Sequence, residues 1–275
     1  MNEPAPILRT ETKENGLAIF NNVVWLDRGN LICIAARPGM GKTALALHVA
    51  MEYAQRCGNT VYIFSLEMSE AQTRSKMMGS LAEVDAYRIR EKTLTEEETA
   101  RMDEAAARLR GMNIVIADET PVSVKDIENK IENDDRIGLI VIDYLQLMTS
   151  GSGSADRRQE INEIMGQLAE LARKKQIPVI VTSQLWRGLE YRKDKHPRLD
   201  DLATMIGELG VNRADTVILL YRDGYYNVTV RDDSDLNKPD EAEVTVAKNR
   251  YGSEGTVMLE WCALFVKFRE MNEER

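Results

Sequence analysis

The stretch with the most specific chemistry is residues 36–43, ARPGMGKT, which stands between an apolar run and a helical pattern. Two glycines, Gly39 and Gly41, allow the backbone to approach a ligand closely because they carry no Cβ. In a strand–loop–helix arrangement, backbone N–H groups surround phosphate oxygens at the N-terminus of the helix. Lys42 would then reach the terminal phosphates, and the Thr43 hydroxyl would hold Mg²⁺. The stretch therefore predicts a phosphate-binding loop (P-loop) for ATP and Mg²⁺.

A metal ion on such a phosphate needs a carboxylate at the end of a neighbouring strand, and Asp143 suits this role. In GLIVIDYLQL, residues 138–147, four apolar residues lead directly into Asp143. A carboxylate among apolar residues is costly unless it is paired or binds a metal. The alternative is an aspartate that caps a helix or forms a salt bridge. Thr43 and Asp143 are thus the predicted Mg²⁺ ligands. The residues predicted to contact the nucleotide are Ala36, Arg37, Pro38, Gly39, Met40, Gly41, Lys42, Thr43, Ala44 and Asp143.

Two further polar side chains end apolar runs that should reach the same rim of a sheet. Glu67 closes VYIFSLE, residues 61–67, and is the predicted general base that orients and activates water. Its alternative role is a negative charge at the N-terminus of a helix that starts at Ser69. Gln184 ends IPVIVTSQ, and its neutral amide is predicted to sense the γ-phosphate. The alternative for Gln184 is a polar group that only serves the core.

Two cations stand one residue apart in AKNRYGSEG, residues 247–255, at the end of an alternating strand-like run. Lys248 and Arg250 occupy positions i and i+2, which share one face of a strand, so both can point to the same side. The alternative is a pair of surface cations near an acidic loop.

These side chains need a sheet that brings the ends of several strands together. Short apolar runs alternate with amphipathic helical stretches, which is typical of a mostly parallel sheet with helices on both faces. After Tyr221 the pattern changes to strands without long helices, which predicts an antiparallel C-terminal extension at one edge. Helices are predicted at 42–56, ended by Gly58, at 156–175, and from the capping boxes at Ser69 and Thr95. The predicted apolar strands are 31–36, 60–67, 113–118, 138–147, 177–184 and 215–221.

The composition limits the class of protein. The chain of 275 residues is 43% hydrophobic and is predicted to form one α/β domain over residues 1–275. Its net charge of −9 disfavours nucleic acid and membrane contact, except where basic loops gather locally, as in residues 185–201. That basic segment is equally well explained as a solvated loop. Three cysteines without paired spacing, and no apolar stretch of bilayer length, predict a soluble cytoplasmic protein that has no membrane contact.

Together these motifs resemble the ATPase domain of the hexameric replicative DNA helicases of bacteria, the DnaB family, which has a RecA-like P-loop NTPase fold. The matching stretches run in family order over residues 31–261. They are AARPGMGKTALAL, FSLEMS, LIVIDYLQLM, RRQEINEIMGQLAELARKKQIPVIVTSQL, ADTVILLYRDGYYN and AKNRYGSEGTV. Ala36, where the usual P-loop begins with glycine, is also what the family has there.

The resemblance implies a role for each residue at the predicted site. Lys42 and Thr43 would act at phosphate and Mg²⁺, Glu67 as catalytic base, Asp143 as Walker B acid and Gln184 as phosphate sensor. It also implies that Lys248 and Arg250 reach the ATP of the neighbouring subunit, the lysine as a sensor and the arginine as a finger. An arginine finger contributes roughly 10³–10⁵ to turnover in well-studied cases.

The resemblance further implies a hexameric ring that moves 5′ to 3′ along single-stranded DNA, with a loader, primase or full-length helicase as partners. Two departures from the family are expected to matter. The N-terminal helical domain and linker helix are expected to be absent, with residues 1–28 as a lead-in. The loop that grips DNA falls at 200–215, where Ala203 replaces a basic residue and the loop is longer, so weak DNA affinity is expected. Alternatives are an ATP-binding assembly or regulatory module that unwinds nothing itself, and a RecA-type recombinase.

Overall fold

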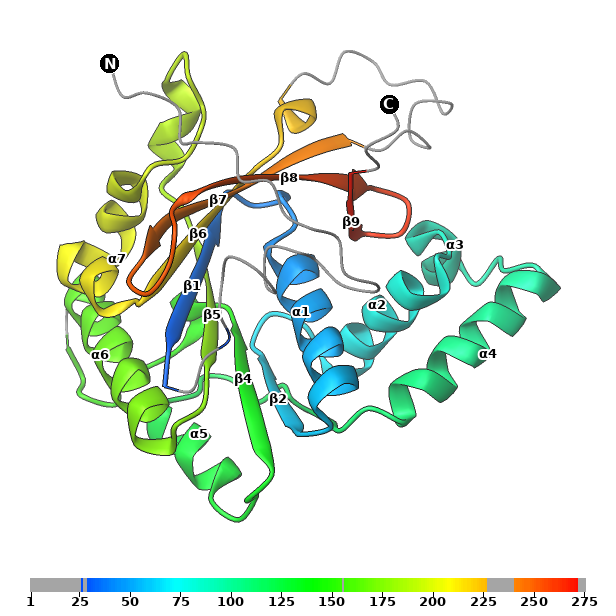
Figure 1. The fold of residues 1–275 in the computed structure, drawn as a ribbon, viewed down its shortest axis with the longest axis horizontal. Helices are drawn as coiled ribbons and strands as arrows, with labels where there is room; N and C mark the ends of the chain where they lie inside the picture. The colour runs from blue at the N-terminus through cyan, green and yellow to red at the C-terminus, as the bar shows by residue number, and fades with distance from the viewer. Residues whose placement is uncertain (1–25, 27–28, 155, 227–239, 272–275) are drawn as a thin grey trace.

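The computed structural model describes residue 26 and residues 29–154, 156–226 and 240–271, and these residues form one twisted sheet with helices on both faces (Figure 1). The strand order is β3-β2-β4-β5-β1-β6-β7-β8-β9. β1 to β6 pair in parallel, and β7 to β9 add an antiparallel extension beside β6. The strands are β1 (Leu31–Ala36), β2 (Thr60–Ser65), β3 (Ile114–Ala117), β4 (Ile137–Asp143), β5 (Val179–Gln184), β6 (Thr216–Tyr221), β7 (Asp240–Asn249), β8 (Gly255–Cys262) and β9 (Lys267–Glu270).

The helices fall into two groups, one on each face of the sheet. α1, α2 and α4 contribute side chains to one apolar cluster, and α5, α6 and α7 contribute to the other. The helices are α1 (Lys42–Cys57), α2 (Glu70–Ala82), α3 (Ala86–Glu91), α4 (Glu96–Arg110), α5 (Val124–Ile131), α6 (Arg157–Lys175) and α7 (Leu199–Arg213). None of the helices in the described ranges is both long enough and apolar enough to cross a bilayer.

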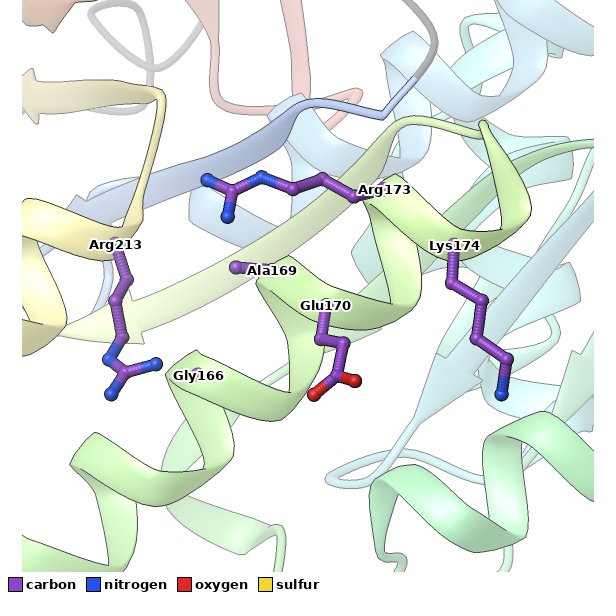
Figure 2. A pocket seen from close by; sticks show the side chains of 6 residues that line it. All are labelled: Gly166, Ala169, Glu170, Arg173, Lys174 and Arg213. Carbon is purple, nitrogen blue, oxygen red and sulfur yellow. The ribbon is translucent and has the colours of Figure 1, made fainter.

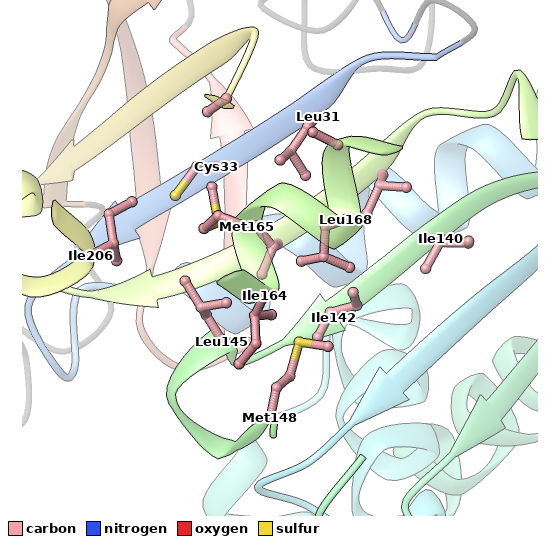
Figure 3. Packing of buried hydrophobic residues seen from close by; sticks show 14 of the residues in the cluster. Leu31, Cys33, Ile140, Ile142, Leu145, Met148, Ile164, Met165, Leu168 and Ile206 are labelled. Carbon is pink, nitrogen blue, oxygen red and sulfur yellow. The ribbon is translucent and has the colours of Figure 1, made fainter. Parts of the chain in front are cut away.

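β1 shows why the central strands are apolar at every position. Its side chains alternate between the two clusters, with Leu31, Cys33 and Ala35 on the α5–α7 face and Ile32, Ile34 and Ala36 on the other. Figure 3 shows Leu31 and Cys33 packed with Met165 and Leu168 of α6. A strand covered on both faces has no solvent-facing positions, so the period-two pattern of a half-exposed strand disappears.

The local signals for helix ends are confirmed. α1 ends at Cys57 and is capped by Gly58, whose φ of 66° is left-handed and whose N–H donates to the Ala54 carbonyl. Ser69 and Thr95 both form complete capping boxes at the starts of α2 and α4. Each box satisfies two backbone donors that the helix itself leaves unpaired.

Two predicted strand boundaries are wrong. The run 138–147 is not one strand, because β4 ends at Asp143 and Leu145–Leu147 form a short 3₁₀ turn that buries Leu145. β2 likewise ends at Ser65, so Glu67 lies beyond the strand. Both runs stay apolar past the strand end because the turns also pack on the core.

The segment 200–215, predicted as a loop, is mostly helix α7. Its start is fixed by Asp201, which accepts the backbone N–H of Arg198 at 2.8 Å, and Leu202 and Ile206 are buried below it. Gly207 interrupts the helix with φ 76° and ψ 156°. The predicted lead-in, residues 1–28, lies outside the described residues apart from Leu26.

Candidate nucleotide-binding site

The carboxyl ends of four parallel strands meet at one cavity of about 310 Å³. The register aligns Ala36 of β1 with Gln184 of β5, and Ser65 of β2 with Asp143 of β4. Side chains just beyond these positions therefore face one another, as they do at the ligand sites of open α/β sheets. The cavity is lined by Pro38, Gly39, Gly41, Lys42, Thr43, Ala44, Glu67, Met68, Lys76, Asp143, Tyr144, Gln184, Trp261 and Val266.

The loop between β1 and α1 has the backbone shape that a phosphate needs. Gly39 and Gly41 have φ of 78° and 103°, which disfavour a side chain. A Cβ on Gly41 would also lie 2.8 Å from the ring of Phe268, and one on Gly39 would lie 2.9 Å from that of Tyr225. Gly41 is the N-cap of α1, so no side chain caps the helix. The N–H groups of the first turn thus remain open to an anion.

Lys42, the first residue of α1, brings a cation to the cavity. Its Nζ lies 3.3 Å from the Arg37 carbonyl. Burial lowers the pKa of Lys42, and the charges of Asp143 and Glu67 oppose this effect without overcoming it. A phosphate placed at Lys42 would supply the anionic partner that favours the charged ammonium.

Asp143 is held on both of its oxygens. Oδ2 accepts a hydrogen bond from Thr43 Oγ1 at 2.7 Å, and Oδ1 accepts one from Thr182 Oγ1 at 2.5 Å. The residue is only 4% exposed, so its orientation is fixed by these two donors and the packing around them. A carboxylate and a hydroxyl next to a phosphate loop are the hard oxygen ligands that suit Mg²⁺. The residues present therefore fit this ion.

Glu67 and Gln184 complete the rim. Glu67 is exposed, two residues past β2, and lines the cavity together with Lys42 and Asp143. Gln184 is half-buried at the end of β5. The structure thus brings together the polar side chains that sequence analysis predicted around the triphosphate: Lys42, Thr43, Glu67, Asp143 and Gln184.

Comparison with known proteins identifies the family. The model of the DnaB-like helicase C terminal domain matches residues 16–270. The chain belongs to this family. It is 39% identical over 253 residues to the replicative DNA helicase DnaB of Geobacillus stearothermophilus, covering 90% of the chain and 54% of that protein. The chain thus spans about half the length of this DnaB helicase.

Solved structures of the DnaB-like family share the fold. One solved ATPase domain superposes with a TM-score of 0.80 at 32% identity, covering 90% of this chain and 86% of that one. A DnaB-like replicative helicase, solved to show its interactions with primase, gives 0.81 at 31% identity and covers 90% and 58%. The prediction of a RecA-like α/β fold with a mostly parallel sheet is confirmed.

Lys248 and Arg250 lie near the amino ends of β1 and β6, whereas the cavity lies at the carboxyl ends of the parallel strands. Thr216, at the start of β6, pairs with Ile32 near the start of β1 and with Asn249 at the end of β7. The P-loop follows the other end of β1, and the strand from Ile32 to Ala36 spans roughly 13 Å at about 3.3 Å per residue. Neither side chain can span this distance to the cavity of its own chain.

Lys248 and Arg250 both donate to the Asn212 carbonyl, at 3.0 and 3.1 Å, although Arg250 lies one residue past the end of β7. Lys248 also donates to the carbonyls of Val211 and Ala214, at 2.9 and 2.6 Å. Burial and the charge of Arg250 lower the pKa of Lys248, against the effect of Asp215. Within one chain, both cations thus hold the C-terminal end of α7.

Two polar side chains that shape the site, Gln146 and Arg222, were not predicted from the sequence. Gln146 holds the end of β5, because its Nε2 donates to Ser183 Oγ at 2.9 Å and its Oε1 accepts the N–H of Gln184 at 3.2 Å. Arg222 donates to the Gly39 carbonyl at 2.9 Å, and its guanidinium lies 4.5 Å from the ring centre of Trp261. Both residues lie in the stretches that resemble the DnaB family. Their role in shaping the site is visible only in their contacts with residues that follow neighbouring strands or end them.

Arg37 supports the P-loop through its side chain in a direction away from the cavity. Its Nε lies 2.9 Å from Glu190 Oε1, and its Nη1 donates to the Leu185 carbonyl at 2.8 Å. Only the backbone of Arg37 is then available to a nucleotide. The pair joins the P-loop to the segment that follows Gln184.

The basic segment 185–201 is largely neutralised by its own carboxylates. Arg192 pairs with Asp201 at 2.9 Å, and Arg198 pairs with Asp194 at the same distance. His196 lies between Asp194 and Glu243, at 2.6 and 3.2 Å. Burial lowers the pKa of His196, but the hydrogen bond with Asp194 and the charge of Glu243 outweigh it and raise the pKa above its ordinary value.

Proposed function

We propose that this chain is a single ATPase domain, residues 1–275, that hydrolyses ATP and drives a replicative DNA helicase. The observation that carries the proposal is the cavity at which the P-loop, Asp143, Glu67 and Gln184 converge. Membership of the DnaB-like family supports the same activity. The proposal includes movement along single-stranded DNA in the 5′ to 3′ direction, within a cytoplasmic hexameric ring.

The residues at the cavity have separate roles in binding and hydrolysing ATP. The open N–H groups of α1 and the ammonium of Lys42 bind the triphosphate, and Thr43 with Asp143 would hold Mg²⁺. When bound, Mg²⁺ neutralises charge on the phosphate oxygens. Glu67 accepts a proton from the attacking water, which contributes about 10²–10⁴ to the rate. Gln184 contacts the γ-phosphate, and Arg37 with Glu190 passes its presence to the segment beyond β5.

The site is completed by a second copy of the chain. Lys248 and Arg250 are too far from their own cavity, so they act on the nucleotide of a neighbour, as sensor and arginine finger. A ring of head-to-tail contacts repeats this arrangement at every interface. Primase, a loader or a full-length helicase are the further partners proposed, since a DnaB-like helicase has been solved with its interactions with primase described.

ATP turnover with and without single-stranded DNA tests the motor function. A motor is expected to hydrolyse ATP faster when DNA is added, and this stimulation should fall steeply with salt. A chain that hydrolyses no ATP in either condition refutes the proposal. Lys42→Ala serves as the negative control, because it removes the cation from the P-loop.

A mixing experiment tests the contribution in trans. Arg250→Ala and Lys42→Ala subunits are each expected to be inactive alone, and equal mixing restores about one interface in four at random. Partial recovery supports a finger from the neighbour. No recovery at any ratio means that the finger acts within one chain or not at all.

A second candidate is an ATP-binding assembly or regulatory module without unwinding activity. The acidic surface of α7 favours it, because Asp200 and Glu208 are exposed where the family grips DNA, and Ala203 offers no charge there. Such a module is expected to turn over ATP slowly and to ignore DNA.

A further inference from the structure

Asp215 is a buried carboxylate at the amino end of β6, on the same side of the sheet as Arg250. It is 1% exposed and stands directly before β6. Its Oδ2 accepts the N–H of Leu31 at 3.0 Å, and its own N–H donates to the Leu31 carbonyl at 2.8 Å. These bonds tie Asp215 to the first residue of β1, the strand that ends in the P-loop.

The second oxygen of Asp215 faces cations. Oδ1 lies 3.3 Å from Arg250 Nε and 3.9 Å from Arg173 Nη2. Figure 2 shows Arg173 extending from α6 toward Arg213, over the groove on that face. Oδ1 is fully buried and receives no well-aligned hydrogen bond in the described residues. Its interaction with the two guanidinium groups is therefore chiefly one of charge.

Arg250 is held on its inner side and open on its outer side. Its backbone N–H donates to the Asp215 carbonyl at 2.9 Å, and its Nη2 donates to the Asn212 carbonyl at 3.1 Å. Nη1 has no partner within the described part of the chain, and the side chain is 41% exposed. An arginine held through Nε and Nη2 keeps Nη1 as an outward donor, which suits recognition of a phosphate oxygen.

A structural role alone does not need the charge of Asp215. Burying a carboxylate costs several kcal/mol unless cations offset it. An asparagine would accept the Leu31 N–H equally well, and it would join β1 to β6 without that cost. The charge is useful only toward Arg250 and Arg173, and Arg250 is the nearer of the two, at 3.3 Å against 3.9 Å.

The geometry points to Asp215 as a positioning residue that sets the direction of the Arg250 guanidinium offered to a neighbouring copy's triphosphate. This inference rests on the proposed function. It also makes β1 a shared element, because its last residue leads into the chain's own nucleotide site and its first residue holds the carboxylate that orients the finger.

The test uses the full chain with Asp215→Asn, which keeps an acceptor for the Leu31 N–H and removes only the charge. Misplacing a catalytic group by about 1 Å can cost roughly 10²-fold in rate. We expect kcat for ATP to fall by about this factor, with KM and the binding of a fluorescent ATP analogue unchanged. Binding stays because the chain's own P-loop is intact. A variant with wild-type kcat, or with weakened nucleotide binding, overturns the inference.

Mixing with Lys42→Ala subunits separates positioning in trans from a defect of the fold. A P-loop from an Asp215→Asn subunit and a finger from a Lys42→Ala subunit are both intact, so activity should partly return. A carboxylate that only stabilises its own chain gives no recovery, and that result refutes the inference.

Arg173→Gln is the matched control. It removes the other cation that faces Asp215 Oδ1. It should leave kcat unchanged, because the ion pair between Arg250 and Asp215 remains. An equal loss of kcat in Arg173→Gln contradicts the specific role of Arg250 in the pair. Failure of the proposed function has a different signature, since the wild-type chain itself would then hydrolyse no ATP.

Discussion

Replacing Thr182 by valine is the sharpest test of how Asp143 is held. Thr182 is fully buried on β5, and its hydroxyl donates to Asp143 Oδ1 at 2.5 Å. Valine has nearly the same shape, so the change removes one hydrogen bond to a charged group, worth about 1.5–3 kcal/mol. We expect the free energy of unfolding to fall by about 2 kcal/mol, which corresponds to roughly 4–8 °C in Tm for a chain of this size.

The same variant should change the need for Mg²⁺. Asp143 would keep only the donor from Thr43, so its carboxylate would be less well oriented. Loss of a residue that orients a metal ligand typically costs about 10–100-fold in metal affinity or activity. We expect the Mg²⁺ concentration for half-maximal ATP turnover to rise by about tenfold, measured as a titration at saturating ATP.

Thr245→Val provides the matched control. The Thr245 hydroxyl bonds Thr256 Oγ1 at 2.9 Å between β7 and β8, so the same atoms change beside a neutral partner. Its stability cost should be about 0.5–1.5 kcal/mol, without any change in the Mg²⁺ titration. If Thr182→Val melts and titrates like Thr245→Val, the view that Thr182 fixes Asp143 is refuted.

Three further predictions follow from single contacts. Gly41→Ala should abolish binding of a fluorescent ATP analogue, because the added Cβ collides with the buried ring of Phe268. Gly58→Ala is the control, because Gly58 also has a positive φ, of 66°, but no atom lies within 4 Å of the added Cβ. This control should lower the free energy of unfolding by about 1–2 kcal/mol and leave nucleotide binding intact. The raised pKa of His196 contributes stability that is complete below its ordinary value of 6.5 and is lost as the pH rises through the folded-state pKa. Denaturant unfolding at several pH values should show this decline, and His196→Gln should lack it. Gln146→Leu should lower kcat by roughly tenfold through a misplaced Gln184, with nucleotide binding retained, and weaker binding would count against this role.

The sheet was predictable because its central strands are buried on both faces. Continuous apolar runs such as 31–36 have no other simple explanation, and the capping boxes report hydrogen bonds within four residues. The order of the strands has no such local signal. Strand ends were misjudged at Glu67 and after Asp143, because the turns there are packed and their composition resembles that of the strands.

Helix α7 was missed because the family resemblance placed a loop at 200–215, and because its own sequence gives a weak helical signal. Gly207 and Gly210 interrupt its sequence, and glycine within a helix lowers its propensity by about 1 kcal/mol each. Tertiary contact compensates, since both glycines lie against the Asn162 side chain of α6. Only the packed structure reveals this contact.

The candidate site was predictable to the extent that its chemistry is local. The P-loop carries its own glycines, cation and hydroxyl, and Asp143 and Gln184 each end an apolar run. Gln146 and Arg222 were missed because their function lies in contacts with residues far along the chain.

Lys248 and Arg250 differ in how many hydrogen bonds within their own chain must break before the side chain can contact a neighbouring subunit. The three carbonyls bound by Lys248 Nζ belong to the end of α7, where a cation also offsets the helix dipole. Moving this ammonium to another subunit breaks charge-assisted bonds worth about 1.5–3 kcal/mol each, so a triphosphate must replace them. Arg250 can reach out with Nη1 while Asp215 keeps Nε. Under the proposed function, the arginine needs no rearrangement before it acts in trans, whereas engagement of the lysine must loosen the end of α7.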